Sequence, residues 1–121
     1  MTSVLNVDEI AAKNGTDPVA LTRQSAAKAW VNYDGSTNTT EDSFNESSVT
    51  DVGTGIFTVT YTNNMSNATP AINVSTTDTS FVGISDKANV TAADVRFEVD
   101  NSASSNRDRN FNALVVHGDL A

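Results

Sequence analysis

The stretch KAWVNYDGSTNTTEDSFNESSVTDVGTGIFTVTY, residues 28–61, decides the fold. Near its end Phe57, Val59 and Tyr61 alternate with threonines. This period of two is typical of a β-strand with one apolar face and one hydroxyl-bearing face. The sequence Gly53-Thr54-Gly55 just before it predicts a turn. We therefore expect a small β-module with few reactive side chains, which favours a scaffold or an adhesive surface over an enzyme.

The rest of the chain to the C-terminus predicts further short strands separated by turn residues. The run from Phe111 to Val116 is the most apolar and is expected to form a central strand. Such spacing is typical of antiparallel sandwiches. The expected fold is all-β, a small antiparallel β-sandwich or jelly-roll-like module over residues 28–121. Strands are expected at residues 28–33, 47–52, 56–62, 71–75, 80–85, 94–99 and 111–117, with a short helical turn near 91–94.

Residues 1–27 differ from the module because their apolar positions are too sparse for independent folding. The turn-forming sequence Asn14-Gly15-Thr16-Asp17-Pro18 divides them. We expect an extended N-terminal arm that docks on another surface during assembly; an ordinary first hairpin of the same domain is the alternative. The apolar positions of this arm are Val4, Leu5, Val7, Ile10, Val19 and Leu21.

Composition excludes several classes of function. The formal net charge of −8 disfavours nucleic-acid binding, which needs clustered basic residues. There is no cysteine, so disulfides and thiolate metal sites are absent. No stretch has the length of a membrane span, and the N-terminus lacks the pattern of a secretory signal. Apolar residues make up 38% of the 121 residues, and such a thin core favours one domain that assembles with copies of itself.

The residues that could support catalysis form no recognisable motif. His117 is the one histidine, and a Ser-His-Asp triad would need it beside both a carboxylate and a hydroxyl. A glycosidase pair could be drawn only from scattered carboxylates, and no calcium-loop motif is present. We therefore predict no enzyme activity, no catalytic or cofactor-binding residue and no dedicated metal site; a surface ion held by acidic loops stays open. The scattered carboxylates are Glu41, Asp42, Glu46 and Glu98.

Trp30 and Tyr33 admit two interpretations. They could anchor the core through the first main strand, because buried Trp and Tyr need only packing and one hydrogen bond each. Alternatively, they could be exposed platforms on which a sugar ring stacks, which would indicate an adhesin that binds a host surface glycan.

The segment AAKAWVNYDG…EDSFNESSVTDVGTGIFTVTYTNNM resembles the repeated C-terminal module of tailed-phage fibre proteins, notably those of marine phages. The final LVVHGDLA is similar to the closing strand of that module, and LNVDEI…GTDPVALT to the linkers that precede it. The chain departs from the pattern at Thr69-Pro70-Ala71-Ile72, where the module usually has an aromatic residue. The matching positions are residues 28–33, 42–45, 47–51, 53–55 and 65.

The resemblance implies a non-enzymatic virion protein on the particle exterior, of the tail-fibre or tail-tip type. Its expected partners are two further copies in a homotrimer, other virion proteins and a host surface, with no nucleic acid and no membrane. The alternative is a capsid decoration protein whose trimer sits on the shell while the N-terminal arm clamps capsid subunits. A polysaccharide depolymerase is a third hypothesis.

Overall fold

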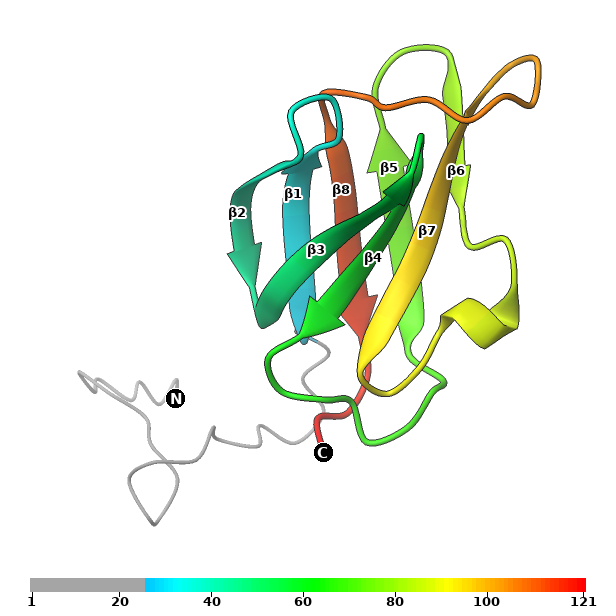
Figure 1. The fold of residues 1–121 in the computed structure, drawn as a ribbon. Helices are drawn as coiled ribbons and strands as arrows, with labels where there is room; N and C mark the ends of the chain where they lie inside the picture. The colour runs from blue at the N-terminus through cyan, green and yellow to red at the C-terminus, as the bar shows by residue number, and fades with distance from the viewer. Residues whose placement is uncertain (1–25) are drawn as a thin grey trace, which may run out of the picture.

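Two four-stranded antiparallel sheets pack face to face in the computed structural model, which describes residues 26–121 (Figure 1). The strand order is β2-β1-β8-β5 in the first sheet and β3-β4-β7-β6 in the second. The predicted all-β antiparallel sandwich is confirmed, whereas the predicted arm lies almost wholly outside the described residues. The strands are β1 (Ala29–Asp34), β2 (Thr39–Phe44), β3 (Glu46–Gly53), β4 (Ile56–Tyr61), β5 (Ala71–Thr76), β6 (Ser80–Gly83), β7 (Asp94–Asn101) and β8 (Asn112–His117).

The core lies between the sheets and consists of the alternate residues of four strands, β1, β4, β7 and β8. Each of these side chains is at most 3% exposed, so every second residue of each strand faces the opposite sheet. Partly buried apolar residues of β3, β5 and β6 pack against this core, namely Val49, Ile72, Val74 and Val82. The strand residues of the core are Ala29, Val31, Tyr33, Phe57, Val59, Tyr61, Val95, Phe97, Val99, Leu114 and Val116.

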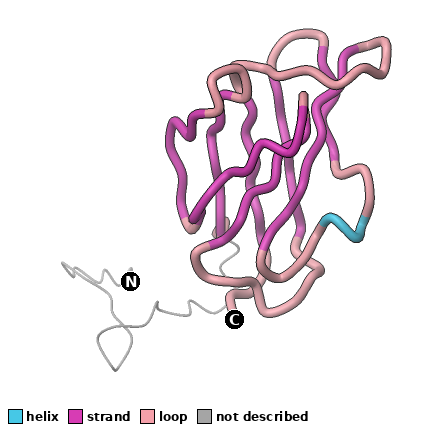
Figure 2. The backbone as a smooth tube through the Cα atoms, viewed as in Figure 1, coloured by secondary structure: helices cyan, strands magenta, loops and turns pink. Residues whose placement is uncertain are grey.

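Three features of the strand pattern differ from expectation. Strand β2 was not predicted, because Thr39–Phe44 is polar and mostly exposed; it forms by pairing with β1 rather than by burial. The predicted strand at 80–85 ends early, at Gly83. The short helical turn is η1 (Lys87–Asn89), not residues 91–94, because the Asp86 carboxylate accepts a hydrogen bond from the Ala88 amide and caps the turn (Figure 2).

Strand β8 occupies the central position that its apolar sequence predicted, between β1 and β5. Its first residue, Asn112, is a buried polar side chain at 1% exposure. The amide group donates to the backbone oxygens of Tyr33 (3.2 Å) and Arg109 (2.9 Å), and its oxygen accepts from the Thr76 hydroxyl (2.9 Å). Because these groups are satisfied, Asn112 can join three separate segments without the cost of an unpaired buried amide.

Asn45 forms the corner at which the chain passes from the first sheet to the second. Its backbone has a φ of 56°, a left-handed conformation that Asn tolerates better than most residues. Its side-chain nitrogen donates to the backbone oxygens of Lys28 and Asn63, and its side-chain oxygen accepts from the Asn63 amide at 2.7 Å. The asparagine of the DSFN sequence therefore has a structural role.

Tyr61 has a buried hydroxyl with no hydrogen-bond partner within residues 26–121. Burial, with a smaller contribution from the Asp94 charge, raises the pKa of Tyr61 to about 12 from 10.0. A pKa raised by folding favours the folded state below the unfolded value, and this contribution is lost as the pH rises from about 10 through about 12. Burial also raises the pKa of Tyr33, with the nearby Asp51, Asp108 and Asp34 charges adding to it.

We therefore expect Tyr61→Phe to be neutral or stabilising by up to about 1 kcal/mol near neutral pH, since it removes an unpaired buried hydroxyl. At alkaline pH the parent protein should lose on the order of 2 kcal/mol of unfolding free energy because Tyr61 ionises more readily in the unfolded chain. The variant has no such hydroxyl and should keep this stability, while the loss due to Tyr33 remains in both proteins. Urea unfolding of both proteins at neutral and at alkaline pH measures the difference. A variant less stable than the parent at neutral pH would show that the hydroxyl does have a partner.

Candidate functional site

An aromatic and apolar surface lies on the outer face of the sheet β2-β1-β8-β5. Trp30 of β1 is directly opposite Phe44 of β2 on one side and Val115 of β8 on the other. Residues directly opposite in antiparallel strands point to the same face, so the three side chains form one row. We call Phe44, Trp30 and Val115 the aromatic row. Phe44 is 53% exposed, and Trp30 and Val115 are half-buried.

Tyr33 fits the core interpretation, whereas Trp30 fits the interpretation as a surface platform. Tyr33 is a core residue at 1% exposure, with its ring edge-on to Phe57 at 5.1 Å and its hydroxyl donating to the Asn38 side chain at 3.0 Å. Trp30 is not part of the buried core and lies on the opposite face of the same strand. A partly exposed indole on the outer face of a sheet is the arrangement that the platform interpretation requires.

Polar groups border the aromatic row. Asn73 of β5 is opposite Val115 and extends the row, and Asp42, Asn32 and Ala113 form the parallel row next to it. The side-chain oxygen of Asn32 is buried and accepts no hydrogen bond within the described part of the chain. The face can therefore bury apolar or ring-shaped groups at its centre and offer amide and carboxylate groups at its margin. A sugar ring and an aliphatic peptide segment both match this chemistry.

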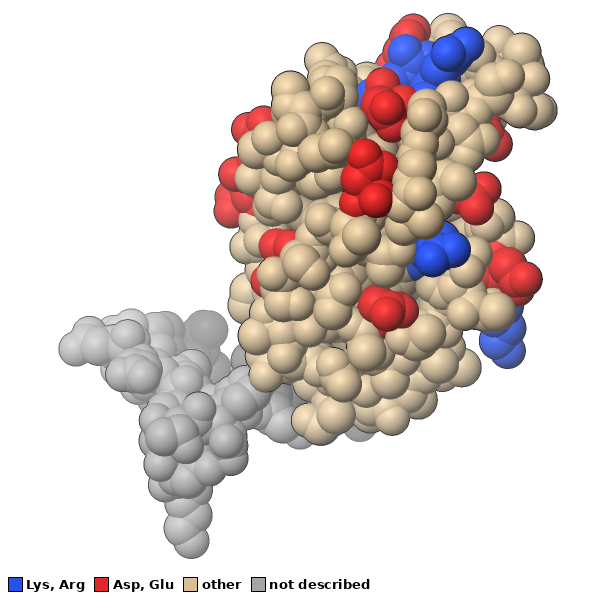
Figure 3. Space-filling view, in the orientation of Figure 1, with Lys and Arg blue, Asp and Glu red and all other residues tan. Residues whose placement is uncertain are grey.

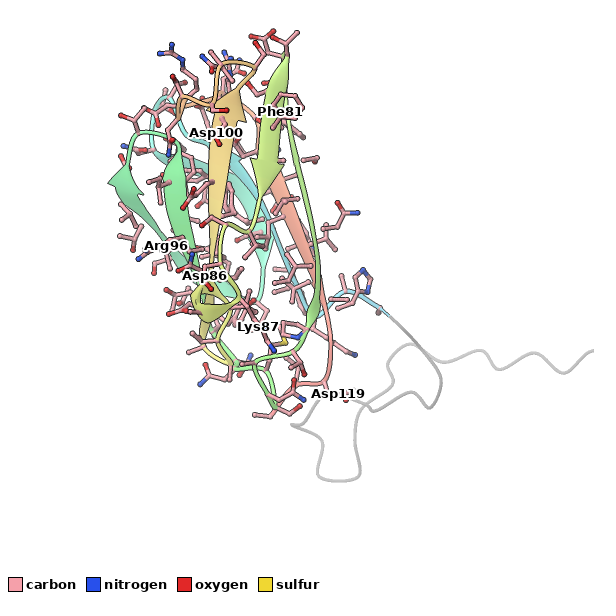
Figure 4. The ribbon with its side chains drawn as sticks, turned by 90° about the vertical axis from the view of Figure 1, so that its right-hand side faces the viewer. Phe81, Asp86, Lys87, Arg96, Asp100 and Asp119 are labelled. Atoms are coloured by element: carbon pink, nitrogen blue, oxygen red, sulfur yellow. The ribbon has the colours of Figure 1, made fainter. Side chains whose placement is uncertain are left out.

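A shallow hollow of about 240 Å³ lies on the second sheet, where β6 and β7 pair. Phe81 is 67% exposed and stands opposite Asp100, near the same end of the two strands (Figure 4). The Glu98 carboxylate accepts from the Ser85 hydroxyl at 2.7 Å, and one Asp100 oxygen is buried with no hydrogen-bond partner among residues 26–121. The lining residues are Phe81, Val82, Gly83, Ile84, Ser85, Glu98 and Asp100.

The structure does not bring the candidate catalytic residues together. Glu98 lines the hollow, whereas Glu41 and Asp42 belong to the edge strand β2 of the other sheet. His117 ends β8, opposite Ala71. Within residues 26–121 no three His, Asp or Glu side chains are placed to share a metal ion. Two carboxylates along one strand are too few ligands for a calcium site, so the hollow offers no defined chemistry.

Charge gives no second site on the visible surface. Figure 3 shows acidic and basic side chains dispersed over the face that carries β3, β4 and β7. Arg109 forms an ion pair with Asp78 at 3.0 Å and donates to the Ser80 hydroxyl, so its cation is engaged within the protein. In the part of the chain that the structure describes, no helix combines the length and the apolar character needed to cross a bilayer.

Comparisons with known proteins identify no relative. No protein-family model matches the chain, and neither a curated protein nor a solved structure is significantly similar to it. The candidate site therefore depends on the geometry of the aromatic row and on the residues themselves.

The sequence interpretation missed Phe44 as a site residue. Phe44 closes β2, a strand without an apolar alternation, and it becomes a neighbour of Trp30 only through the β1–β2 register. The one available signal was the large apolar side chain in an otherwise polar stretch, TTEDSF. The predicted arm residues Val4, Leu5, Val7, Ile10, Val19 and Leu21 lie outside the described residues.

Proposed function

We propose that this chain is a non-enzymatic structural subunit on the exterior of a tailed-phage particle, of the tail-fibre or tail-tip type. It assembles as a homotrimer and contributes to particle assembly and to contact with the host surface. The observation that carries the proposal is the aromatic row, in which the exposed Phe44 adjoins the partly exposed Trp30 and Val115 on the outer face of one sheet. Exposed apolar surfaces of this kind are typical of interaction sites.

The residues behind the resemblance to fibre modules have roles that suit a scaffold. Trp30 and Phe44 supply two of the three members of the aromatic row. Asn45 forms the corner between the sheets, and Gly55 forms the tight turn between β3 and β4. The resemblance thus concerns side chains that build the sandwich and shape one of its surfaces, which supports a structural and adhesive role.

A capsid decoration protein is the second candidate. It is favoured by the position at which the N-terminal segment joins the module: the Lys28 amide donates to the Val116 carbonyl at 2.7 Å, two residues before Trp30. A segment that joins the fold beside an apolar surface is suited to linking neighbouring subunits, as a shell clamp requires.

Locating the subunit in purified particles tests the proposal and separates the two candidates. We expect antibody labelling and copy-number measurement by mass spectrometry to place a few trimers on the tail. Many copies spread over the shell would favour decoration, and absence from particles would contradict both. Sedimentation should give about three times the chain mass of 12.8 kDa. Shortening of host polysaccharide by the purified trimer would contradict the non-enzymatic assignment.

A further inference from the structure

We propose that the N-terminal segment of this chain, residues 4–21, binds the aromatic row and covers Trp30. The inference rests on the assembly role in the proposed function and names the surface that receives the segment. The contact would join the segment's aliphatic side chains to Phe44, Trp30 and Val115. Those side chains are Val4, Leu5, Val7, Ile10, Val19 and Leu21.

The receiving surface is continuous and partly exposed to solvent. Phe44, Trp30 and Val115 are direct neighbours across three strands, and Ala113 lies two residues before Val115 on the same face of β8. Phe44 at 53% exposure has more than half of its surface in water. In contrast, the alternate residues of β1 and β8 are at most 1% exposed on the core side. The sheet therefore has one apolar face that is buried and, on its other face, an apolar row that stays partly exposed.

The described chain starts close to this row. The described chain begins at Ala26, and the hydrogen bond from Lys28 to Val116 fixes it to β8 before Trp30 follows on the outer face. Lys28 lies seven positions after Leu21, and in extended form this stretch spans about 24 Å. The row crosses three strands, a width of about 10 Å. The tether is long enough to place the segment on the row and short enough to keep its local concentration high.

The chemistry of the two sides matches. The segment supplies branched aliphatic side chains, which pack well against flat aromatic rings and need no charged partner. The row itself contains no charged residue, and the carboxylate of Asp42 belongs to the adjoining row. A sugar could stack on the same indole, but it would have to displace a segment tethered a few residues away.

Trp30 provides a direct test because it is the one tryptophan of the chain, so intrinsic fluorescence reports on the row alone. We compare the full-length chain with the variant Val7→Asp/Ile10→Asp, in which two charges oppose apolar burial. The expected result is a shift of Trp30 emission to longer wavelength and a larger acrylamide quenching constant. The matched control is Thr2→Asp/Thr16→Asp, with the same charges at polar positions, and it should leave both quantities unchanged. Circular dichroism verifies that each variant retains the sandwich.

A second measurement maps the contact without relying on fluorescence. A photo-cross-linking residue at position 10 of the full-length chain should couple to peptides that contain Phe44, Trp30 or Val115. Phe44→Ser should weaken this coupling, whereas Phe81→Ser, at the exposed phenylalanine of the other sheet, should not.

Unchanged emission in the Val7→Asp/Ile10→Asp variant would overturn the proposal, as would cross-links to the hollow between β6 and β7. Emission that depends on protein concentration but not on the segment would identify the folded module of a second copy as the occupant. Emission that responds to host polysaccharide but not to the segment would identify a glycan. Either result would also overturn the proposal. The position of the subunit in particles is measured independently, so failure here leaves the proposed virion function untouched.

Discussion

Replacement of Phe57 by Ala is expected to lower the free energy of unfolding by about 3–5 kcal/mol. The Phe57 ring is 0% exposed. Its centroid lies 5.1 Å from that of Tyr33 in the first sheet and 5.5 Å from that of Phe97 in the second, so it connects the two sheets within the core. The site cannot easily collapse around the smaller side chain. Gly35 already approaches the ring so closely that a Cβ there would be 2.6 Å from it, and both flanking rings belong to hydrogen-bonded strands. The substitution therefore leaves a cavity and removes two aromatic contacts.

Urea unfolding followed by far-UV circular dichroism measures the loss for Phe57→Ala. The matched control is Phe81→Ala, which removes the same ring from a position that is 67% exposed, and we expect it to cost less than about 1 kcal/mol. Similar losses for the two variants would show that the centre of the core is not the Tyr33–Phe57–Phe97 cluster.

The strands in which apolar and polar residues alternate could be predicted from the sequence. Phe57, Val59 and Tyr61 of β4 face the core, as their alternation with threonines implies, and the apolar Leu114 and Val116 belong to β8, an inner strand of its sheet. These strands are recognisable because burial on one face selects the side chains, and the side chains are what a sequence displays.

Strand β2 could not be predicted in this way because burial does not form it. Thr39–Phe44 is an edge strand held by backbone pairing with β1, and a register shift between Asn32 and Tyr33 interrupts that pairing. Its exposed polar and acidic side chains are a common protection of a sheet edge against further pairing. These side chains do not indicate which strand pairs with β2.

The candidate site could be predicted only in part, because it too depends on strand pairing. Trp30 and Tyr33 are three residues apart in β1 and point to opposite faces of the sheet, whereas both interpretations of the sequence had given the two residues the same role. The partners of Trp30 were not accessible, because Phe44 and Val115 reach it through pairings between distant parts of the chain. The aromatic row is a property of strand register rather than of any local motif.

Gly55 is the position where the turn between β3 and β4 leaves least room for another residue. It has a φ of 66°, and its amide donates to the Asp108 carboxylate at 2.7 Å while its carbonyl accepts from the Val99 amide at 2.8 Å. A Cβ built on it would lie 2.6 Å from both the Arg107 nitrogen and the Val99 oxygen. Both are backbone atoms that hydrogen-bond to each other at 2.9 Å, so neither can move aside without breaking the pairing.

Gly55→Ala should therefore destabilise the sandwich by about 3 kcal/mol or more. The left-handed backbone alone costs an Ala residue about 1–2 kcal/mol, and the contacts with fixed backbone atoms add strain to that. Thermal or urea unfolding measures the loss, and Gly53→Ala is the matched control in the same turn. A Cβ at Gly53 would meet nothing within 4 Å, and we expect a change of less than about 1 kcal/mol there. Equally small losses at the two glycines would contradict the prediction. They would mean that Gly55 does not pack against the segment around Arg107 and that both glycines of the GTG sequence can be replaced.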